Sequence, residues 1–81
     1  MKQNATNRAP RDMTRHEFLA ALRRRGLEPA GWMGYVECPL SDGSRVSISR
    51  LNAGDRYRDG LAYILREIDR HEAEIARKAE G

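Results

Sequence analysis

The spacing of the apolar residues changes twice along this chain, and these changes limit the folds that it can adopt. Between residues 14 and 25, and again from residue 57 onward, apolar residues recur at intervals of three and four. Between residues 35 and 49 they alternate with polar residues. The first spacing is typical of a helix and the second of a strand. The sequence therefore predicts an α+β fold: a single small domain with an N-terminal helix, an antiparallel β-hairpin and a long C-terminal helix.

Local signals mark both ends of the first helix. Thr14 followed by Glu17 is a capping box, in which each side chain accepts the backbone N–H of the other residue. Gly26 suits the left-handed conformation that ends many helices, and Leu27 is then placed to contact Leu22, as in a Schellman motif. We therefore expect the helix to begin just after Thr14 and to end just before Gly26.

Two alternating segments, residues 35–38 and 45–49, predict the hairpin. Residues 41–44 between them carry an Asp-Gly pair, which suits a tight turn. Pro39 has no N–H donor and should close the first strand. Residues 28–31 contain Pro and Gly, which predicts a connector between helix and hairpin. The side chains expected to face the core are Val36, Cys38, Val46 and Ile48, and those expected on the outer face are Tyr35, Glu37, Arg45, Ser47 and Ser49.

The last helix is indicated by a stripe of apolar residues at helical spacing. Its first residue should lie between Ala53 and Asp59, because Asn52, Asp55 and Asp59 are all suitable caps. Gly60 should weaken the first turn by about 1 kcal/mol relative to alanine. The stripe consists of Tyr57, Leu61, Ile64, Leu65, Ile68 and Ile75.

Length and composition indicate how the chain is organised. It has 81 residues, of which 40% are hydrophobic and 33% charged, an ordinary globular composition for one domain. Residues 1–12 carry basic groups without an apolar period, so we expect a flexible basic tail, followed by a single αββα domain over residues 13–81. One cysteine excludes an internal disulfide and suits a reducing compartment, and no apolar run approaches a membrane span. We expect a cytoplasmic protein, in the host cytoplasm if a phage encodes it, that does not bind membranes.

Residue types that carry catalysis or bind metals are few and scattered. His16 and His71 lie on different predicted helices and Cys38 lies on a strand between them, which is not the spacing of a zinc site. We expect His16 to be exposed and Cys38 to pack as a small apolar side chain. Acidic residues of the last helix alternate with arginines, as on a solvated ion-pair face. The sequence thus predicts no catalytic, cofactor-binding or metal-binding residues and no enzyme.

Basic charge is concentrated in the first third of the chain. Residues 1–25 hold seven basic and two acidic residues, a net charge of +5, while the middle and last thirds each carry −1. Such a segment attracts nucleic acid or another acidic surface. Trp32, Met33 and Tyr35 cluster where the connector enters the hairpin, and they either cover the core or form a contact patch. The residues predicted to bind a partner are Arg15, Arg23, Arg24, Arg25, Trp32 and Tyr35.

The order of elements resembles small phage and mobile-element proteins, among them anti-CRISPR inhibitors and the lambda-type head-to-tail joining protein W. The likeness to W is carried by Met13, Thr14 and Arg15 with Glu17, followed by one hairpin and one final helix. The likeness to anti-CRISPR inhibitors is one of size, charge and lack of a catalytic motif. The helix, turn and hairpin also resemble HicA-type ribonuclease toxins. Their pattern places a histidine on the sheet where this chain has Gly-Tyr-Val at residues 34–36, which argues against nuclease activity.

These resemblances imply a non-enzymatic phage-type inhibitor of the anti-CRISPR kind, which binds and blocks a functional surface of a larger host protein or ribonucleoprotein complex. The basic arm and first helix support an alternative, a small nucleic-acid-binding protein. A phage structural or assembly protein is a further alternative. A domain of this size leaves apolar surface uncovered. Because Ile75 should lie beyond the compact core, a homodimer through the C-terminal helix is another candidate assembly.

Overall fold

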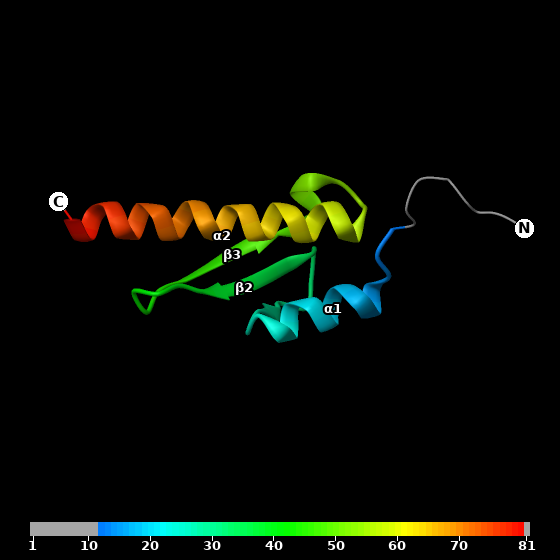
Figure 1. Ribbon diagram of the computed structural model, residues 1–81. Helices are drawn as coiled ribbons and strands as arrows, with labels where there is room; N and C mark the ends of the chain where they lie inside the picture. Colours follow the sequence, from blue (N-terminus) through cyan, green and yellow to red (C-terminus); the bar gives the residue numbers. More distant parts are fainter. Residues whose placement is uncertain (1–11, 81) are drawn as a thin grey trace, which may run out of the picture.

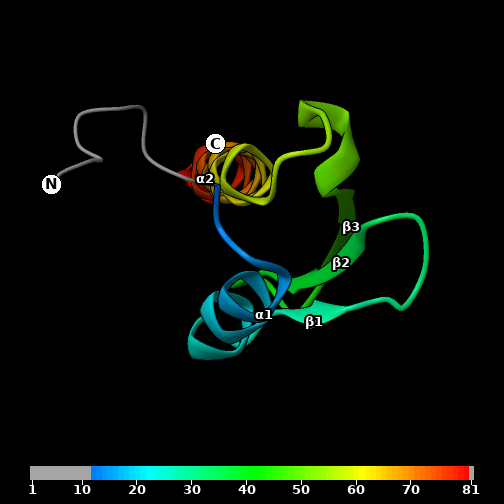
Figure 2. The same cartoon turned by 90° about the vertical axis from the view of Figure 1, so that its right-hand side faces the viewer.

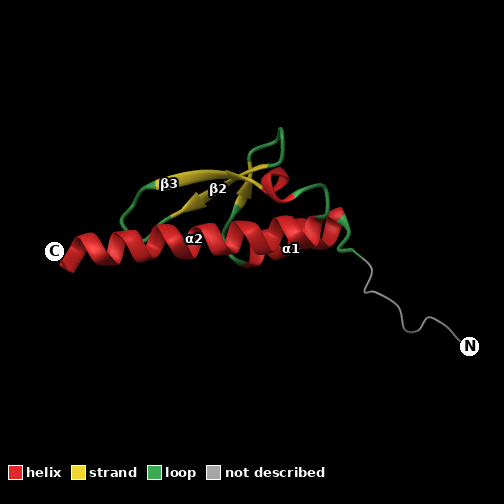
Figure 3. Ribbon diagram, turned by 90° about the horizontal axis from the view of Figure 1, so that it is seen from above, coloured by secondary structure: helices red, strands yellow, loops and turns green. Residues whose placement is uncertain are grey.

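The computed structural model describes residues 12–80 as a helix, three strands and a long helix (Figure 1). The elements are α1 (Arg15–Arg24), β1 (Glu28–Pro29), β2 (Tyr35–Pro39), β3 (Arg45–Ser49), the 3₁₀ helix η1 (Arg50–Ala53) and α2 (Tyr57–Glu80). The strands form one antiparallel sheet in the order β1-β2-β3. Figure 2 and Figure 3 show from two directions that both helices lie on the same side of this sheet. The predicted α+β class, with its N-terminal helix, hairpin and long C-terminal helix, is confirmed.

Helix α1 begins and ends through the predicted local contacts. Thr14 N–H donates to Glu17 Oε1 at 2.8 Å, and Glu17 N–H donates to Thr14 Oγ1 at 3.1 Å. At the other end Gly26 adopts φ +71°, and Leu27 N–H donates to the Leu22 carbonyl at 2.9 Å. This is the bond that defines a Schellman motif. Each of these signals involves at most six consecutive residues, so the sequence alone was sufficient to predict both ends of the helix.

Strand β1 was not predicted, because residues 28–31 were expected to be a connector. In the structure Glu28 pairs with Glu37 and Pro29 with Val36, so that β1 extends the hairpin to three strands. Strand β1 lies at the edge of the sheet, where a proline without an N–H is tolerated. A strand of two residues is too short to show an alternating pattern, so only its pairing with β2 identifies it.

The hairpin has the predicted strands and turn. Pro39 ends β2, and the turn closes through Gly43 at φ +90°. Of the side chains expected in the core, three are buried and Val46 is partly buried. Ser49, expected on the outer face, is nevertheless only 8% exposed. Its hydroxyl donates to the Met33 carbonyl at 2.9 Å and accepts the N–H of Leu51 at 3.2 Å, so the adjoining loops cover it.

The core lies between the sheet and the two helices. Cys38 is fully buried, and burial, aided by the neighbouring Glu37 charge, raises the pKa of its thiol to about 11. The thiol is therefore protonated and unreactive at neutral pH, which confirms that Cys38 packs as an apolar side chain. The buried cluster consists of Phe18, Leu22, Leu27, Val36, Cys38, Ile48 and Ile64.

Helix α2 begins at Tyr57, within the predicted interval, but the expected caps do not hold its first turn. The Asp12 carboxylate accepts the N–H of Tyr57 at 3.3 Å and that of Arg58 at 3.2 Å. Asp12 had been assigned to the flexible tail, whereas here it belongs to the folded domain. Residues 1–11, the remainder of that predicted tail, lie outside the described residues.

The exposed face of α2 carries ion pairs along the helix. Arg70 pairs with Glu67 at 2.6 Å, and Arg77 pairs with Glu74 seven residues further along the helix. These pairs confirm the solvated ion-pair face that the sequence predicts. Across residues 12–80, every helix is too short or too polar to traverse a bilayer.

Helix α2 also packs closely against η1. Gly60 is buried, and a Cβ atom built on it would lie 2.7 Å from Arg50 Cβ and 3.2 Å from the Arg50 carbonyl oxygen. Such distances are too short for a carbon contact. The glycine that was expected only to weaken the helix is therefore what allows η1 to approach it. This approach also fixes the position of Arg50, which belongs to the site described next.

Candidate binding site

A sharply bent loop, residues 30–34, joins β1 to β2. Gly31 and Gly34 have φ values of +91° and +70°, and Met33 has φ +47°, which makes it the one non-glycine residue with positive φ within residues 12–80. Left-handed backbone is costly for a residue with a side chain and persists only where neighbouring structure holds it.

Contacts at the C-terminal end of this loop, residues 33 and 34, hold it in place. The Gly34 carbonyl accepts the N–H of Arg50 at 2.9 Å, and the Met33 carbonyl accepts the Ser49 hydroxyl. A Cβ atom on Gly34 would lie 2.9 Å from Leu51 Cγ, so η1 packs tightly on the loop. The loop is therefore a braced turn, in which contacts with β3 and η1 hold the backbone.

The loop exposes its two largest apolar side chains. Trp32 is 62% exposed and Met33 is 65% exposed. Tyr35 is partly buried, and its ring centroid lies 5.4 Å from that of Trp32. The sequence left open whether this cluster covers the core or forms a contact patch. The structure excludes a core role for Trp32 and Met33.

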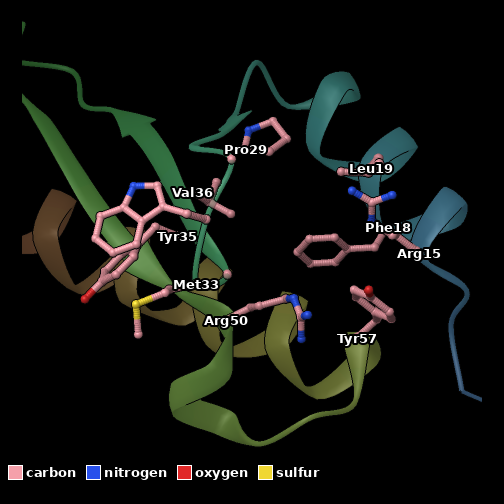
Figure 4. Close-up of a pocket in the computed structure, with 12 residues that line it drawn as sticks. Arg15, Phe18, Leu19, Pro29, Met33, Tyr35, Val36, Arg50 and Tyr57 are labelled. Carbon is pink, nitrogen blue, oxygen red and sulfur yellow. The ribbon is translucent and has the colours of Figure 1, made fainter.

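Beside the loop lies a hollow of about 230 Å³. Figure 4 shows it between the start of α1 and the beginning of β2, with Arg50 and Tyr57 on one side. Its lining combines arginine and aromatic side chains with an apolar floor, and none of the described residues that line it carries a carboxylate, imidazole or thiol. The lining residues are Arg15, Phe18, Leu19, Pro29, Gly31, Trp32, Met33, Gly34, Tyr35, Val36, Arg50 and Tyr57.

Arg50 is held in the hollow by aromatic rings. Its guanidinium carbon lies 4.2 Å from the Tyr57 ring centroid and 5.8 Å from that of Phe18. The two rings are themselves 5.2 Å apart. A guanidinium over an aromatic face is attracted by the ring quadrupole. Within residues 12–80, neither Arg50 nor Arg15 forms an ion pair with a carboxylate.

The predicted partner-binding residues fall into two groups. Arg15, Trp32 and Tyr35 meet at the hollow. Arg23, Arg24 and Arg25 are exposed at the opposite end of α1, roughly 13 Å away along the helix axis.

Among the lining residues that sequence reasoning did not name as binding residues are Met33, Arg50 and Tyr57. Met33 had been noted in the cluster but not among the binding residues. Tyr57 had been counted as a core-facing member of the helical stripe. Nothing in the local sequence around Arg50 distinguishes it from the exposed arginines of the chain, because its position depends on contacts with the distant loop and with α2.

The side chains that line the hollow offer hydrogen-bond donors and apolar surface. Its arginines donate hydrogen bonds and its rings offer flat apolar faces. His16 is exposed on α1, as predicted. In the part of the chain that the structure describes, no three His, Cys, Asp or Glu side chains converge as metal ligands would.

Comparison of the chain with protein-family models, with curated proteins and with solved structures finds no match.

Proposed function

We propose that this protein is a non-enzymatic inhibitor of the phage type, which binds a functional surface of a larger host complex and blocks it. Its contact surface is the Trp32 surface, defined as Arg15, Trp32, Met33, Tyr35 and Arg50. The observation that carries the proposal is the pair of adjacent exposed side chains, Trp32 and Met33, on a braced turn. The host cytoplasm, where a single cysteine stays reduced, is the proposed place of action.

Two physical arguments support this surface. Trp, Tyr, Met and Arg are the residue types enriched at protein interfaces. A few anchor residues, which include Trp, Tyr and Arg above all, supply most of the binding free energy at an interface. A turn that is already ordered loses little conformational entropy when a partner covers it. Inhibition by occupancy needs a stable, well-placed contact surface and no chemistry of its own, which suits the binding groups found here.

The test is capture from host-cell lysate by the immobilised wild-type protein, with and without nuclease treatment. The Trp32→Ala variant removes the main anchor, and Arg45→Ala is the matched control, because Arg45 is similarly exposed but lies on β3 outside the hollow. We expect a defined protein complex to be recovered by wild type and Arg45→Ala, independently of nuclease, and to be lost with Trp32→Ala. Equal recovery by Trp32→Ala would contradict the proposal.

A second candidate is nucleic-acid binding by α1. The observation in its favour is that Arg23, Arg24 and Arg25 are consecutive and exposed, without a carboxylate partner among residues 12–80. Phosphate binding through these arginines would make log affinity fall with log salt by roughly 0.7 to 0.9 per neutralised phosphate. Nuclease-sensitive capture, or oligonucleotide binding lost in the triple alanine variant, would favour this candidate.

A further inference from the structure

Arg50 is oriented by packing and has no anionic partner among residues 12–80. Its backbone N–H is bonded to Gly34, its Cβ lies against Gly60, and its guanidinium rests on the Tyr57 ring. Within the described residues, the guanidinium forms one hydrogen bond, from Nη1 to the Asp55 carbonyl at 3.5 Å, which is at the limit of such a bond. The remaining N–H donors have no protein acceptor within residues 12–80.

A guanidinium fixed in this way is prepared to bind an anion. Arginine presents a rigid fork of donors that matches the two oxygens of a carboxylate, and less entropy is lost when the fork is already oriented. The charge is partly shielded from water by aromatic and apolar neighbours, which strengthens its attraction to an anion. Arg15 adds a second positive charge to the same lining.

The size and surroundings of the hollow favour a protein side chain as its occupant. Its volume of about 230 Å³ is below the roughly 300 to 1,000 Å³ of typical small-molecule pockets. The floor of the hollow is apolar. Trp32 and Met33 also line it and are exposed, so an apolar residue beside the occupant would cover them favourably. A nucleic acid would engage a row of phosphates, but the clustered arginines Arg23, Arg24 and Arg25 lie at the other end of α1.

We infer that the hollow receives an acidic side chain of the partner, with an apolar residue next to it in the partner's sequence. Arg50 binds the carboxylate, Arg15 supports the charge from the α1 side, and Trp32 and Met33 cover the apolar neighbour. This inference rests on the proposed function and specifies the chemistry of the segment that the partner must supply.

The test uses a minimal probe, acetyl-Glu-Phe-amide, titrated into ¹⁵N-labelled full-length protein and followed by NMR. The neutral acetyl-Gln-Phe-amide is the matched ligand control. We expect saturable shifts of the Trp32 indole N–H and of Gly34 with the glutamyl probe, and binding weaker by roughly tenfold with the glutaminyl probe, as for loss of a charge-assisted hydrogen bond. Equal binding of the two probes would overturn the inference.

Protein variants identify the binding group. Arg50→Gln should weaken the glutamyl probe by roughly tenfold, whereas Arg45→Gln, on the sheet, should bind as wild type. Dispersion of the signals from α2 reports whether Arg50→Gln is folded. If it is not, Arg15→Gln replaces it: Arg15 is exposed, and its variant should weaken binding severalfold. Unchanged binding in the folded variants would overturn the assignment.

Further outcomes separate this inference from the proposed function. Uridine 5′-monophosphate is titrated in parallel, and tighter binding of this nucleotide than of the glutamyl probe would overturn the choice of an acidic protein segment. If Trp32→Ala loses the captured complex but the glutamyl probe does not bind, the function stands and this inference is wrong. If the probe binds through Arg50 while Trp32→Ala captures the complex normally, the carboxylate site stands and the proposed contact surface is wrong.

Discussion

The carboxylate of Asp12 accepts the backbone N–H of Tyr57, 45 residues further along the chain. Asp12 thus joins the segment before α1 to the first turn of α2, where backbone N–H groups have no partner within the helix. The same carboxylate also accepts the N–H of Arg58 and of Met13. One side chain therefore connects the two helices at the end of the molecule that carries the hollow.

Replacing Asp12 by alanine should lower the free energy of unfolding, because the first N–H groups of α2 lose their acceptor. Asp12→Asn keeps one acceptor oxygen and should lose less. Asp55→Ala is the control, since Asp55 was a sequence-predicted cap that does not hold the helix. Urea unfolding monitored by circular dichroism gives the comparison, and an equal loss for Asp55→Ala would argue against the role of Asp12.

The cap predicts a dependence of stability on pH. Burial tends to raise the pKa of Asp12, but the backbone N–H groups of Arg58, Met13 and Tyr57 prevail and hold it below the ordinary value of 3.8. A lowered folded-state pKa stabilises the fold above that ordinary value, and the contribution is lost as the pH falls through the folded-state pKa. The hydrogen bond from Arg70 likewise holds the pKa of Glu67 below 4.5.

We therefore expect the free energy of unfolding to decline as the pH falls below about 4.5, the ordinary value for Glu67. The difference in the free energy of unfolding between wild type and Asp12→Asn should have its full size at neutral pH and should become smaller below pH 3.8. Urea titrations at a series of pH values measure both. A difference that grows toward acid pH would have the wrong sign for this cap.

Gly60→Ala distinguishes helix propensity from packing. Propensity alone predicts a gain of about 1 kcal/mol. The new Cβ would meet Arg50 Cβ at 2.7 Å, and overpacking of this kind typically costs about 1 to 3 kcal/mol. We expect a net loss of stability on urea unfolding, together with weaker binding of the glutamyl probe because Arg50 must move.

The control for this change is Ala62→Gly, at an exposed position of the same helix, which should cost about 1 kcal/mol through propensity alone. Probe binding should be unaffected by it. A stabilised Gly60→Ala variant would show that η1 shifts away from α2 without cost.

Trp32→Ala should separate binding from stability. Trp32 is 62% exposed, so its truncation should change the free energy of unfolding by no more than about 0.5 kcal/mol. As an interface anchor it should cost about 2 kcal/mol or more in affinity for the captured partner, mainly through faster dissociation. Surface plasmon resonance measures the rates, and thermal unfolding measures the stability.

The Arg23→Ala, Arg24→Ala, Arg25→Ala triple variant is the comparison for that measurement. Arginines at the rim of a protein interface should change mainly the association rate and its dependence on salt. If the dissociation rate rises strongly in the triple variant and is unchanged in Trp32→Ala, the contact surface lies at the C-terminal end of α1 instead.

Ile75→Glu tests the homodimer predicted through the C-terminal helix. Ile75 is partly buried beside Leu40 at the hairpin end, but it does not belong to the core cluster. The remaining exposed apolar surface is where a second copy would pack. Sedimentation velocity should show a dimer for wild type and a monomer for Ile75→Glu. If wild type and Ile75→Glu are both monomeric and capture the partner equally, the C-terminal end of α2 has no role in assembly.

Features that depend on residues close together in the chain could be predicted from the sequence. The Thr14–Glu17 capping box, the Leu22–Leu27 closure and the turn through Gly43 each involve a few consecutive residues, so local chemistry determines them. The α+β class followed from the period of the apolar residues, because burial on one face requires that period in any helix or strand.

Features that depend on distant residues were decided by the tertiary structure. Strand β1 exists because β2 offers it an edge, and α2 is capped by Asp12 because the fold brings that carboxylate to its first turn. Arg50 forms no ion pair with a carboxylate of the described residues, and its orientation depends on a loop and a helix that are separate in sequence. The pattern of apolar and polar residues indicates which side chains are buried. Which groups contact one another across the chain depends on how the helices and strands pack. For that reason the sequence alone could propose Arg15, Trp32 and Tyr35 as binding residues, and only the structure could place them with Arg50 around one hollow.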